Sequence, residues 1–196
     1  MDYKEKFISI FNEKISRQGS SDLLNWISST DFFVAPASTK FHGAKKSGLV
    51  EHSVKVYEVL RSKFFEPSVD DEESFAIAAL LHDLCKINLY KISYRNVKNE
   101  STGVWEKSPF YSIDDSFPFG HGEKSVFLIE RFMRLKPAEA VAIRWHMGGF
   151  DDSVKGAGYS SPISLAFDKY PLSVKLAISD LESTYLHEKG TSTVNI

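Results

Sequence analysis

The chain has 196 residues, of which 42% are hydrophobic, 13% aromatic and 26% charged, and its formal net charge is −2. This composition predicts one domain over residues 1–196 with a core of ordinary size, and it does not fit a disordered chain. Lysine and arginine are spread along the chain, which argues against a protein that binds long nucleic-acid duplexes. A small anionic nucleotide or a short oligonucleotide fits this charge better as a partner.

The chain contains a single cysteine, Cys85, which excludes an intramolecular disulfide framework and fits a reducing cytosol. We interpret Cys85 itself as a small apolar filler. The N-terminal stretch MDYKEKFISIF is charged and amphipathic, unlike a signal peptide, and no apolar run approaches the length of a membrane span. We therefore expect a cytoplasmic protein that does not enter a membrane.

Apolar residues at helical spacing predict helices in the first half of the chain. They recur between residues 7 and 15, and Ser21 then opens a second short helix. The segment from Ala35 to Gly48 contains proline, glycine and serine and is expected to be a loop. A helix should follow from about Leu49 to Phe65, and another should begin near Asp70 and run through Ile87.

Short alternating aromatic and polar pieces replace the helical pattern between about residues 90 and 118. The pieces KISYRNV and VWEKSPFYSI are separated by the polar turn KNESTG, which is typical of a β-hairpin. The predicted fold class is therefore all-α, a helical bundle with a small β-hairpin insert.

Helices are expected to resume after this insert, at about Glu123 to Leu135 and at Ala138 to His146. A long segment from Phe150 to Tyr170 is rich in glycine, serine and aspartate and is expected to be a loop. Pro171 should begin a last helix that ends near His187, and the tail after Gly190 is expected to be loose.

Isolated polar residues lie on apolar helix faces. His82 and Asp83 lie in the apolar run LLHDLCK, His52 shares its face with Leu49 and Val56, and Asp180 has apolar residues at helical spacing before it. One buried histidine is more often a hydrogen-bonded core residue than a metal ligand. Several such faces beside a carboxylate are harder to explain in that way, because burial of an unpartnered carboxylate is costly. A shared divalent cation would satisfy them.

Two further histidines lie at expected helix ends beside glycines, His121 in GHGEKS and His146 in IRWHMGG. Two extra imidazoles could supply a second metal ion, about 3.5 to 4 Å from the first, with Asp83 as the bridging carboxylate. Alternatively, His146 caps the C-terminus of its own helix and His121 is an ordinary loop residue.

The motifs GLVEHS, LLHDLCK, GHGEKS, RWHMGG and SDLESTY, in this order, resemble the HD superfamily of metal-dependent phosphohydrolases over about residues 35–185. The lead-in APASTKFHGAKKSG and the HDxxK form are most similar to the HD domains of 3′-to-5′ exoribonucleases and related phosphodiesterases. Three features depart from these relatives: Lys86 replaces the glutamate typical of the single-metal deoxynucleotidase branch, no additional nucleic-acid-binding domain is visible, and the hairpin insert is longer.

The resemblance implies an HD-domain helical bundle and a metal-dependent phosphohydrolase or phosphodiesterase that cleaves phosphoester bonds of nucleotides or short oligonucleotides. It also implies divalent metal, expected as two ions of Mn²⁺, Fe, Ni²⁺ or Mg²⁺, and imidazole-rich sites favour the transition metals. Asp83 is the candidate for orienting the attacking water. The implied metal ligands are His52, His82, Asp83, Asp180, His121 and His146.

Substrate phosphate requires cations or backbone donors. Lys86 stands one turn after the His82-Asp83 pair and is the candidate catalytic cation, unless it is a solvated residue at the helix end. Lys45 and Lys46 lie in the loop before the His52 helix and could reach a phosphate. Lys124 belongs to a helix start whose free N–H groups could receive an anion.

The hairpin supplies Arg95 among aromatic residues, and such a mixture could stack a base and cover the pocket. The same residues could instead form the apolar underside of the hairpin, packed on its domain. His42 is a weaker candidate for metal binding or proton transfer. Two other functions stay open: a (deoxy)nucleotide phosphatase or triphosphohydrolase that uses the same metal chemistry, and a catalytically inactive nucleotide-binding sensor.

Overall fold

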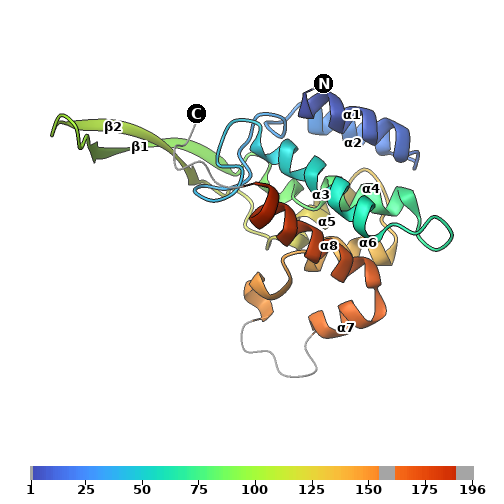
Figure 1. Cartoon of the computed structure of the whole chain (residues 1–196). Coiled ribbons are helices and arrows are strands. Elements are labelled where there is room, and N and C mark those ends of the chain that lie inside the picture. The colour runs from blue at the N-terminus through green and yellow to red at the C-terminus, as the bar shows by residue number, and fades with distance from the viewer. Residues whose placement is uncertain (1, 155–161, 189–196) are drawn as a thin grey trace.

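The computed structural model describes residues 2–154 and 162–188, and the tail expected to be loose lies outside them. Eight α-helices and one antiparallel sheet of two strands make up the regular structure of the described residues, apart from short turns of 3₁₀- and π-helix (Figure 1). The elements are α1 (Tyr3–Lys14), α2 (Ser20–Ser28), α3 (Gly48–Phe64), α4 (Glu72–Leu81), β1 (Tyr90–Lys98), β2 (Trp105–Ile113), α5 (Gly122–Glu130), α6 (Pro137–Trp145), α7 (Pro162–Lys169) and α8 (Pro171–Glu182).

The predicted all-α class is wrong, because β1 and β2 are regular strands of nine residues each that pair along their whole length. The protein is mostly helical with a two-stranded antiparallel sheet, an architecture compatible with a helical bundle that carries a small hairpin. The sheet projects from the helical body as an arm, visible to the left of the helices in Figure 1. No helix of the described residues is both long and apolar enough to cross a membrane.

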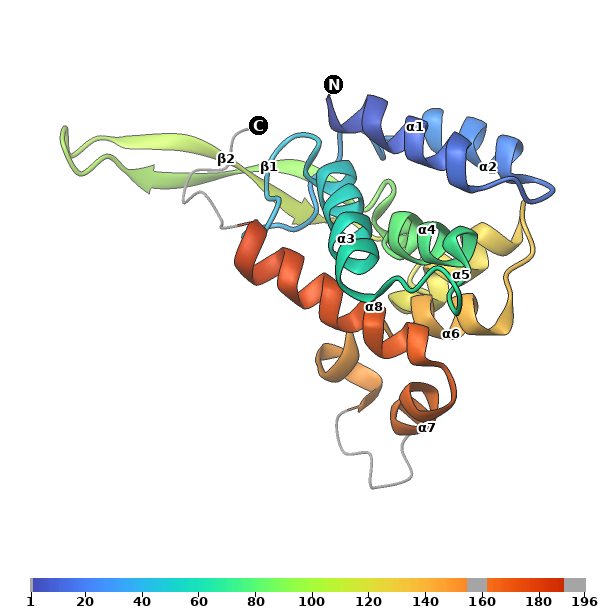
Figure 2. The same ribbon diagram turned by 45° about the vertical axis from the view of Figure 1, so that its right-hand side comes forward.

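Helix α4 lies at the centre of the body, with α1, α3, α6 and α8 packed against it (Figure 2). Every residue from Ser74 to Leu81 is buried. A helix that is apolar on all sides is stable only when it is enclosed by other elements, and the run FAIAALL meets this condition. Its N-terminus is capped by Asp71, whose side chain accepts a hydrogen bond of 3.2 Å from the backbone N–H of Glu73.

Two predicted segments differ from the structure. The helix expected to run through Ile87 ends at Leu81, and Leu84–Lys86 form a separate turn of 3₁₀-helix. The segment expected to be a loop up to Tyr170 contains α7, which packs against α6 and α8. The last helix begins at Pro171 as predicted and continues as a π-helical turn over Ser183–His187.

A buried ion network joins the segment after α1 to α4 and α6. The Arg17 guanidinium donates to both carboxylate oxygens of Glu139, at 2.6 and 2.8 Å, and to Glu73 at 3.0 Å. Glu139 is fully buried, and the Ser74 hydroxyl also donates to it at 2.6 Å. These hydrogen bonds raise the pKa of Arg17 further above its ordinary value, although burial opposes the shift. The network therefore holds three elements together through one buried carboxylate.

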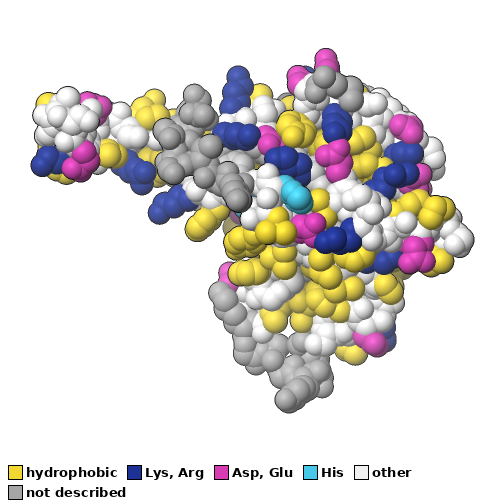
Figure 3. Space-filling model, viewed as in Figure 1, with side chains coloured by type: hydrophobic (Ala, Val, Ile, Leu, Met, Phe, Trp, Pro, Cys, Tyr) yellow, Lys and Arg dark blue, Asp and Glu magenta, His cyan; other side chains and the backbone are white. Residues whose placement is uncertain are grey.

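The arm is a regular hairpin in which Tyr90 pairs with Ile113 at its base and Lys98 pairs with Trp105 near its tip. Side chains toward the tip are exposed, since Tyr94 and Trp105 each retain 66% of their accessible surface. Figure 3 shows both dark blue cationic and yellow apolar side chains along the arm. The expected hairpin at about residues 90–118 thus spans 90–113, and its tip does not pack on the domain.

Candidate metal centre

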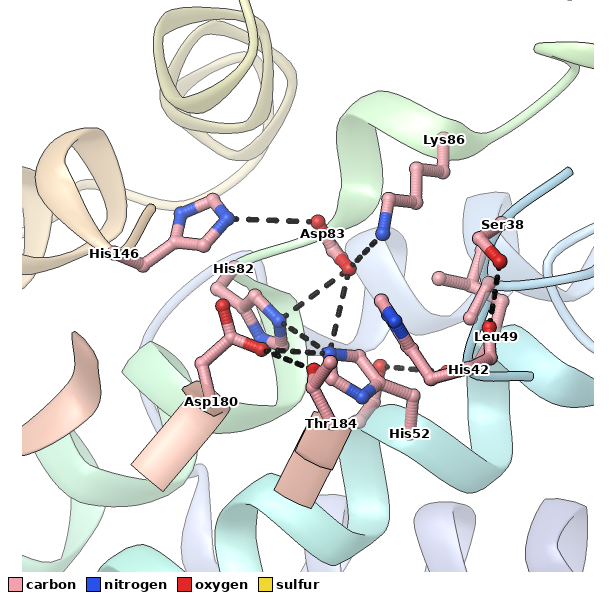
Figure 4. Close-up of polar contacts among 12 residues, drawn as sticks. Ser38, His42, Leu49, His52, His82, Asp83, Lys86, His146, Asp180 and Thr184 are labelled. Carbon is pink, nitrogen blue, oxygen red and sulfur yellow. Dashed lines mark hydrogen bonds and ion pairs between the residues drawn. The ribbon is translucent and has the colours of Figure 1, made fainter. Parts of the chain in front are cut away.

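Six side chains from five parts of the fold meet at one end of α4, and Figure 4 labels five of them, all but His121. One comes from the first half of α3, two from the turn after α4, one from the residue before α5, one from the residue after α6, and one from α8. They are the six metal ligands proposed from the sequence: His52, His82, Asp83, His121, His146 and Asp180.

The carboxylate of Asp83 lies at the centre of this cluster. Its Oδ1 atom is 3.0 Å from Nε2 of His121 and 3.6 Å from Nε2 of His146. Its Oδ2 atom is 3.4 Å from Nε2 of His82 and 3.6 Å from Nε2 of His52. Asp83 therefore joins two groups of imidazoles, one on each of its oxygens.

Two helices end on imidazoles of the cluster. His82 donates from Nδ1 to the carbonyl of Ala79 at 2.8 Å, and His146 does the same to Ile143 at 2.7 Å. Each imidazole thus takes a carbonyl near the end of its own helix, which explains why α4 stops at Leu81 although the apolar run continues. A ring that donates from Nδ1 carries its lone pair on Nε2 when it is neutral, and this is the tautomer that binds metals.

The imidazole nitrogens that point into the cluster lack hydrogen-bond donors to pair with. The carboxylate of Glu188 holds Nδ1 of His52 at 3.1 Å, while Nε2 of His52 lies 3.2 Å from Nε2 of His82 and 3.1 Å from the Asp180 carboxylate. The buried Nε2 atom of His146 has no hydrogen-bond partner among the described residues. Two lone pairs that face each other, and a third that is unpartnered, need a proton or a cation between them. The donor set therefore fits a divalent metal ion.

The pKa shifts in the cluster follow from burial and from the carboxylates. Burial alone would lower the pKa of His52, but hydrogen bonds with Asp180 and Glu188 outweigh it and raise that pKa to about 10. Burial lowers the pKa values of His82 and His121. Burial opposes ionisation of Asp83, yet the positive charge of Lys86 and the neighbouring imidazoles hold its pKa well below its usual value. In the absence of metal, a proton on His52 would thus separate the two facing nitrogens.

Three donors beside the cluster lie outside the set of six implied metal ligands. Glu188 was missed, because it lies beyond the last predicted helix and no apolar stripe marks it. Cys85, interpreted as a filler, places its sulfur 3.4 Å from Nδ1 of His121, but burial raises the pKa of its thiol to about 12, so it is protonated at neutral pH. The weaker candidate His42 packs its ring 5.0 Å from that of His52, and its buried Nδ1 has no hydrogen-bond partner among the described residues.

The cluster opens into a cavity of about 680 Å³. Asp83, His121 and Asp180 reach its wall, and so does Lys86, whose ammonium donates to Oδ2 of Asp83 at 2.7 Å. The cavity extends along the loop of residues 37–42 to Tyr90 at the base of the arm. A small anionic substrate in this cavity would therefore contact both the proposed ligands and a buried cation.

The other cations proposed for phosphate binding lie elsewhere. Lys45 pairs with Glu51 at 2.7 Å, Lys46 is exposed, and neither lines the cavity. Lys124 is buried and pairs with Asp115 at 2.7 Å, also away from the cavity wall. Arg95 lines a smaller hollow beside the arm. Of the five cations, the structure brings only Lys86 to the proposed ligands.

Close contact between α5 and α6 sets the distance between His121 and His146, whose ring centres are 5.0 Å apart. Gly122 permits this contact, because a Cβ atom there would lie 2.3 Å from the carbonyl oxygen of Arg144. We expect Gly122→Ala to lower the free energy of unfolding by about 1–3 kcal/mol, measured by urea denaturation. Gly149→Ala is the control, since a Cβ there meets nothing within 4 Å, and equal losses in both variants would contradict the packing argument.

Comparisons with protein-family models, with curated proteins and with solved structures found no match to this chain. The chemistry of the site therefore follows from its own donors. Four sets of three donors, each with its donor atoms within 4.8 Å of one another, could hold a metal ion. The sets are His42, His52 and Glu188; His52, His82 and Asp180; His82, Asp83 and His146; and Asp83, Cys85 and His121.

Imidazole nitrogens and single carboxylate oxygens suit first-row transition metals better than Mg²⁺ or Ca²⁺, which prefer oxygen ligands. The second nitrogen of each of three ligand imidazoles is already fixed, by the carbonyls of Ala79 and Ile143 and by the carboxylate of Glu188. Such outer partners orient the ring and raise its basicity as a ligand. The arrangement could therefore hold a cation next to a cavity whose wall also carries the ammonium group of Lys86.

Proposed function

We propose that this protein is a metal-dependent phosphohydrolase that cleaves phosphoester bonds in nucleotides or short oligonucleotides. The observation that carries the proposal is the position of Asp83, whose two oxygens face two separate groups of imidazole nitrogens at the wall of one cavity. A carboxylate placed in this way suits a bridge between two metal ions in phosphoester hydrolysis.

In this proposal one metal ion is held by His52, His82, Asp83 and Asp180, and a second by Asp83, His121 and His146. Mn²⁺, Fe and Ni²⁺ suit these donors best, and Mg²⁺ suits them less well. When bound, such ions polarise phosphoryl oxygens and make water more acidic. The resemblance of the five sequence motifs to the HD superfamily supports the same ligand assignment.

The protein's own groups would position the substrate. Lys86 is the buried cation on the cavity wall, and its ammonium can donate to a phosphate oxygen as well as to Asp83. Asp83 lies between the two groups of imidazoles, where its carboxylate can accept a hydrogen bond from a water molecule and orient it for attack in line with the leaving group. Both roles use side chains held rigidly by α4 and the turn that follows it.

The test is hydrolysis of bis(p-nitrophenyl) phosphate and of a short RNA by the purified protein with Mn²⁺. We expect activity that EDTA removes and that Mn²⁺ restores, because the proposed chemistry needs bound cation. The double variant His82→Ala/Asp83→Ala should lose it, whereas His187→Ala is the matched control, since that histidine is half exposed and its ion pair among the described residues is with Glu182 at the surface. Retained activity in the double variant would rule the site out.

Product analysis separates the alternatives. Release of nucleoside with phosphate or triphosphate from nucleotides, without cleavage of diesters, would favour the (deoxy)nucleotide phosphatase or triphosphohydrolase. Thermal stabilisation by nucleotides with no product would favour the inactive sensor. Cleavage of the RNA into nucleoside monophosphates would support the phosphodiesterase.

A further inference from the structure

A second hollow, of about 280 Å³, lies beside the arm and adjoins the main cavity. The two share Thr39, Lys40 and Ile113 in their walls. The shared residues come from the loop before α3 and from the last residue of β2. The space beside the proposed metal centre therefore continues along the base of the arm, and we call this second hollow the arm groove.

The arm groove has the chemistry of an anion site. Its wall contains two cations, Lys40 and Arg95, and no carboxylate. The guanidinium of Arg95 lies 5.5 Å from the centre of the Phe110 ring, which also lines the groove. A guanidinium stacked on a ring is held in place while its N–H edge stays free for a phosphate.

Lys40 and Arg95 are free to bind an anion, in contrast to three other lysines proposed for phosphate binding. Neither Lys40 nor Arg95 forms an ion pair with any residue that the structure describes, whereas Lys86, Lys124 and Lys45 each pair with a carboxylate at 2.7 Å. Residues 90–113, which form the arm, contain four cationic side chains and two carboxylates, while the whole chain has a net charge of −2. The arm thus carries an excess of positive charge on a slightly acidic protein.

We propose that the arm groove binds a second phosphate of the substrate, one nucleotide away from the scissile phosphate. The inference rests on the proposed function, and it narrows the substrate class to dinucleotides and longer single strands. The ammonium of Lys40 neutralises that phosphate where the two hollows meet. The guanidinium of Arg95, which lies over the Phe110 ring, donates hydrogen bonds to it. A substrate with a single phosphate uses the main cavity alone and gains nothing from the groove.

The test compares two substrates in two double variants. Lys40→Ala/Arg95→Ala removes both groove cations, and Lys98→Ala/Lys107→Ala removes two exposed arm cations that do not line the groove. For an RNA of about ten nucleotides, kcat/KM should fall at least about tenfold in the groove variant and much less in the control. Hydrolysis of bis(p-nitrophenyl) phosphate, which has one phosphate, should stay unchanged in the control variant. In the groove variant it should fall much less than hydrolysis of the RNA, since Lys40 also lines the main cavity but Arg95 does not.

Binding of the labelled RNA in EDTA, followed by fluorescence anisotropy, gives a readout that does not need activity. Loss of one phosphate contact should reduce the slope of log K against log salt by about 0.7 in the groove variant. If the wild-type protein cleaves neither substrate, the proposed function fails and this binding measurement alone decides the groove. Equal losses in the groove and control variants, or none in either, would overturn the inference.

Discussion

Replacement of Asp83 by asparagine is expected to lower metal-dependent phosphodiester hydrolysis by more than about 100-fold, the upper range for loss of even an outer metal-site partner. Asparagine keeps the size of the side chain but removes the charge that both groups of imidazoles face. The same change should also release bound metal. Initial rates with Mn²⁺, together with elemental analysis of the purified variant, measure the two effects.

Two further variants make this result specific. Asp114→Asn alters an exposed carboxylate that pairs with Lys91 on the arm, and it should leave the rate unchanged. His121→Asn keeps the Asp83 carboxylate and removes a donor on its Oδ1 side only, so the amount of bound metal should fall by about half if two ions bind. Urea denaturation in metal-free buffer checks folding, because Asp83→Asn also deprives buried Lys86 of its counterion. Undiminished hydrolysis in a folded Asp83→Asn variant would refute the assignment.

Arg17→Met should be strongly destabilising although it lies outside the site, with a loss of about 3–5 kcal/mol in the free energy of unfolding. The substitution leaves the fully buried Glu139 carboxylate without its guanidinium partner, while the Ser74 hydroxyl and the Lys136 backbone N–H still donate to it. Equilibrium denaturation in urea measures the loss as a lower midpoint at an unchanged slope.

The control uses an arginine with the opposite environment. The side chain of Arg134 is 92% exposed and pairs with Glu130 at 3.3 Å, so Arg134→Met should change the stability by less than about 0.5 kcal/mol. In the double variant Arg17→Met/Glu139→Gln the buried charge is removed as well, and part of the lost stability should return. A loss of stability in Arg17→Met no larger than that in Arg134→Met would show that the network contributes little.

The spacing of apolar residues in the sequence predicted the metal-site residues better than the residues that would contact the substrate. His52 and Asp180 could be placed on apolar stripes from spacing alone, and such stripes face the core in a bundle. Lys45 has a long flexible side chain, and its nearest carboxylate, Glu51, satisfies it away from the cavity. Sequence spacing does not rank such partners. Glu188 follows a π-helical turn, for which the residues give no pattern.

The errors in the fold have similar physical causes. The end of α4 depends on a side chain that competes for a backbone carbonyl. The imidazole of His82 donates to the carbonyl of Ala79, which would accept a backbone N–H if the helix continued. Helix α7 has only eight residues, and its stability comes from packing on α8 rather than from a strong pattern of its own. The hairpin could be predicted from its alternating aromatic and polar residues. That it projects from the body could not, because this depends on the absence of packing between its tip and the described helices.

The enclosure of α4 has a consequence for the endurance of the site. Because neighbouring helices surround α4, its backbone hydrogen bonds should break only on global unfolding. The turn that follows α4 should therefore also have a high free energy of local unfolding. The arm is not surrounded in this way, since Tyr94 and Trp105 are largely exposed. Its strands should therefore open locally at a lower cost in free energy. The proposed chemistry would thus take place in the most rigid part of the fold, while the arm could change its position to fit the bound substrate.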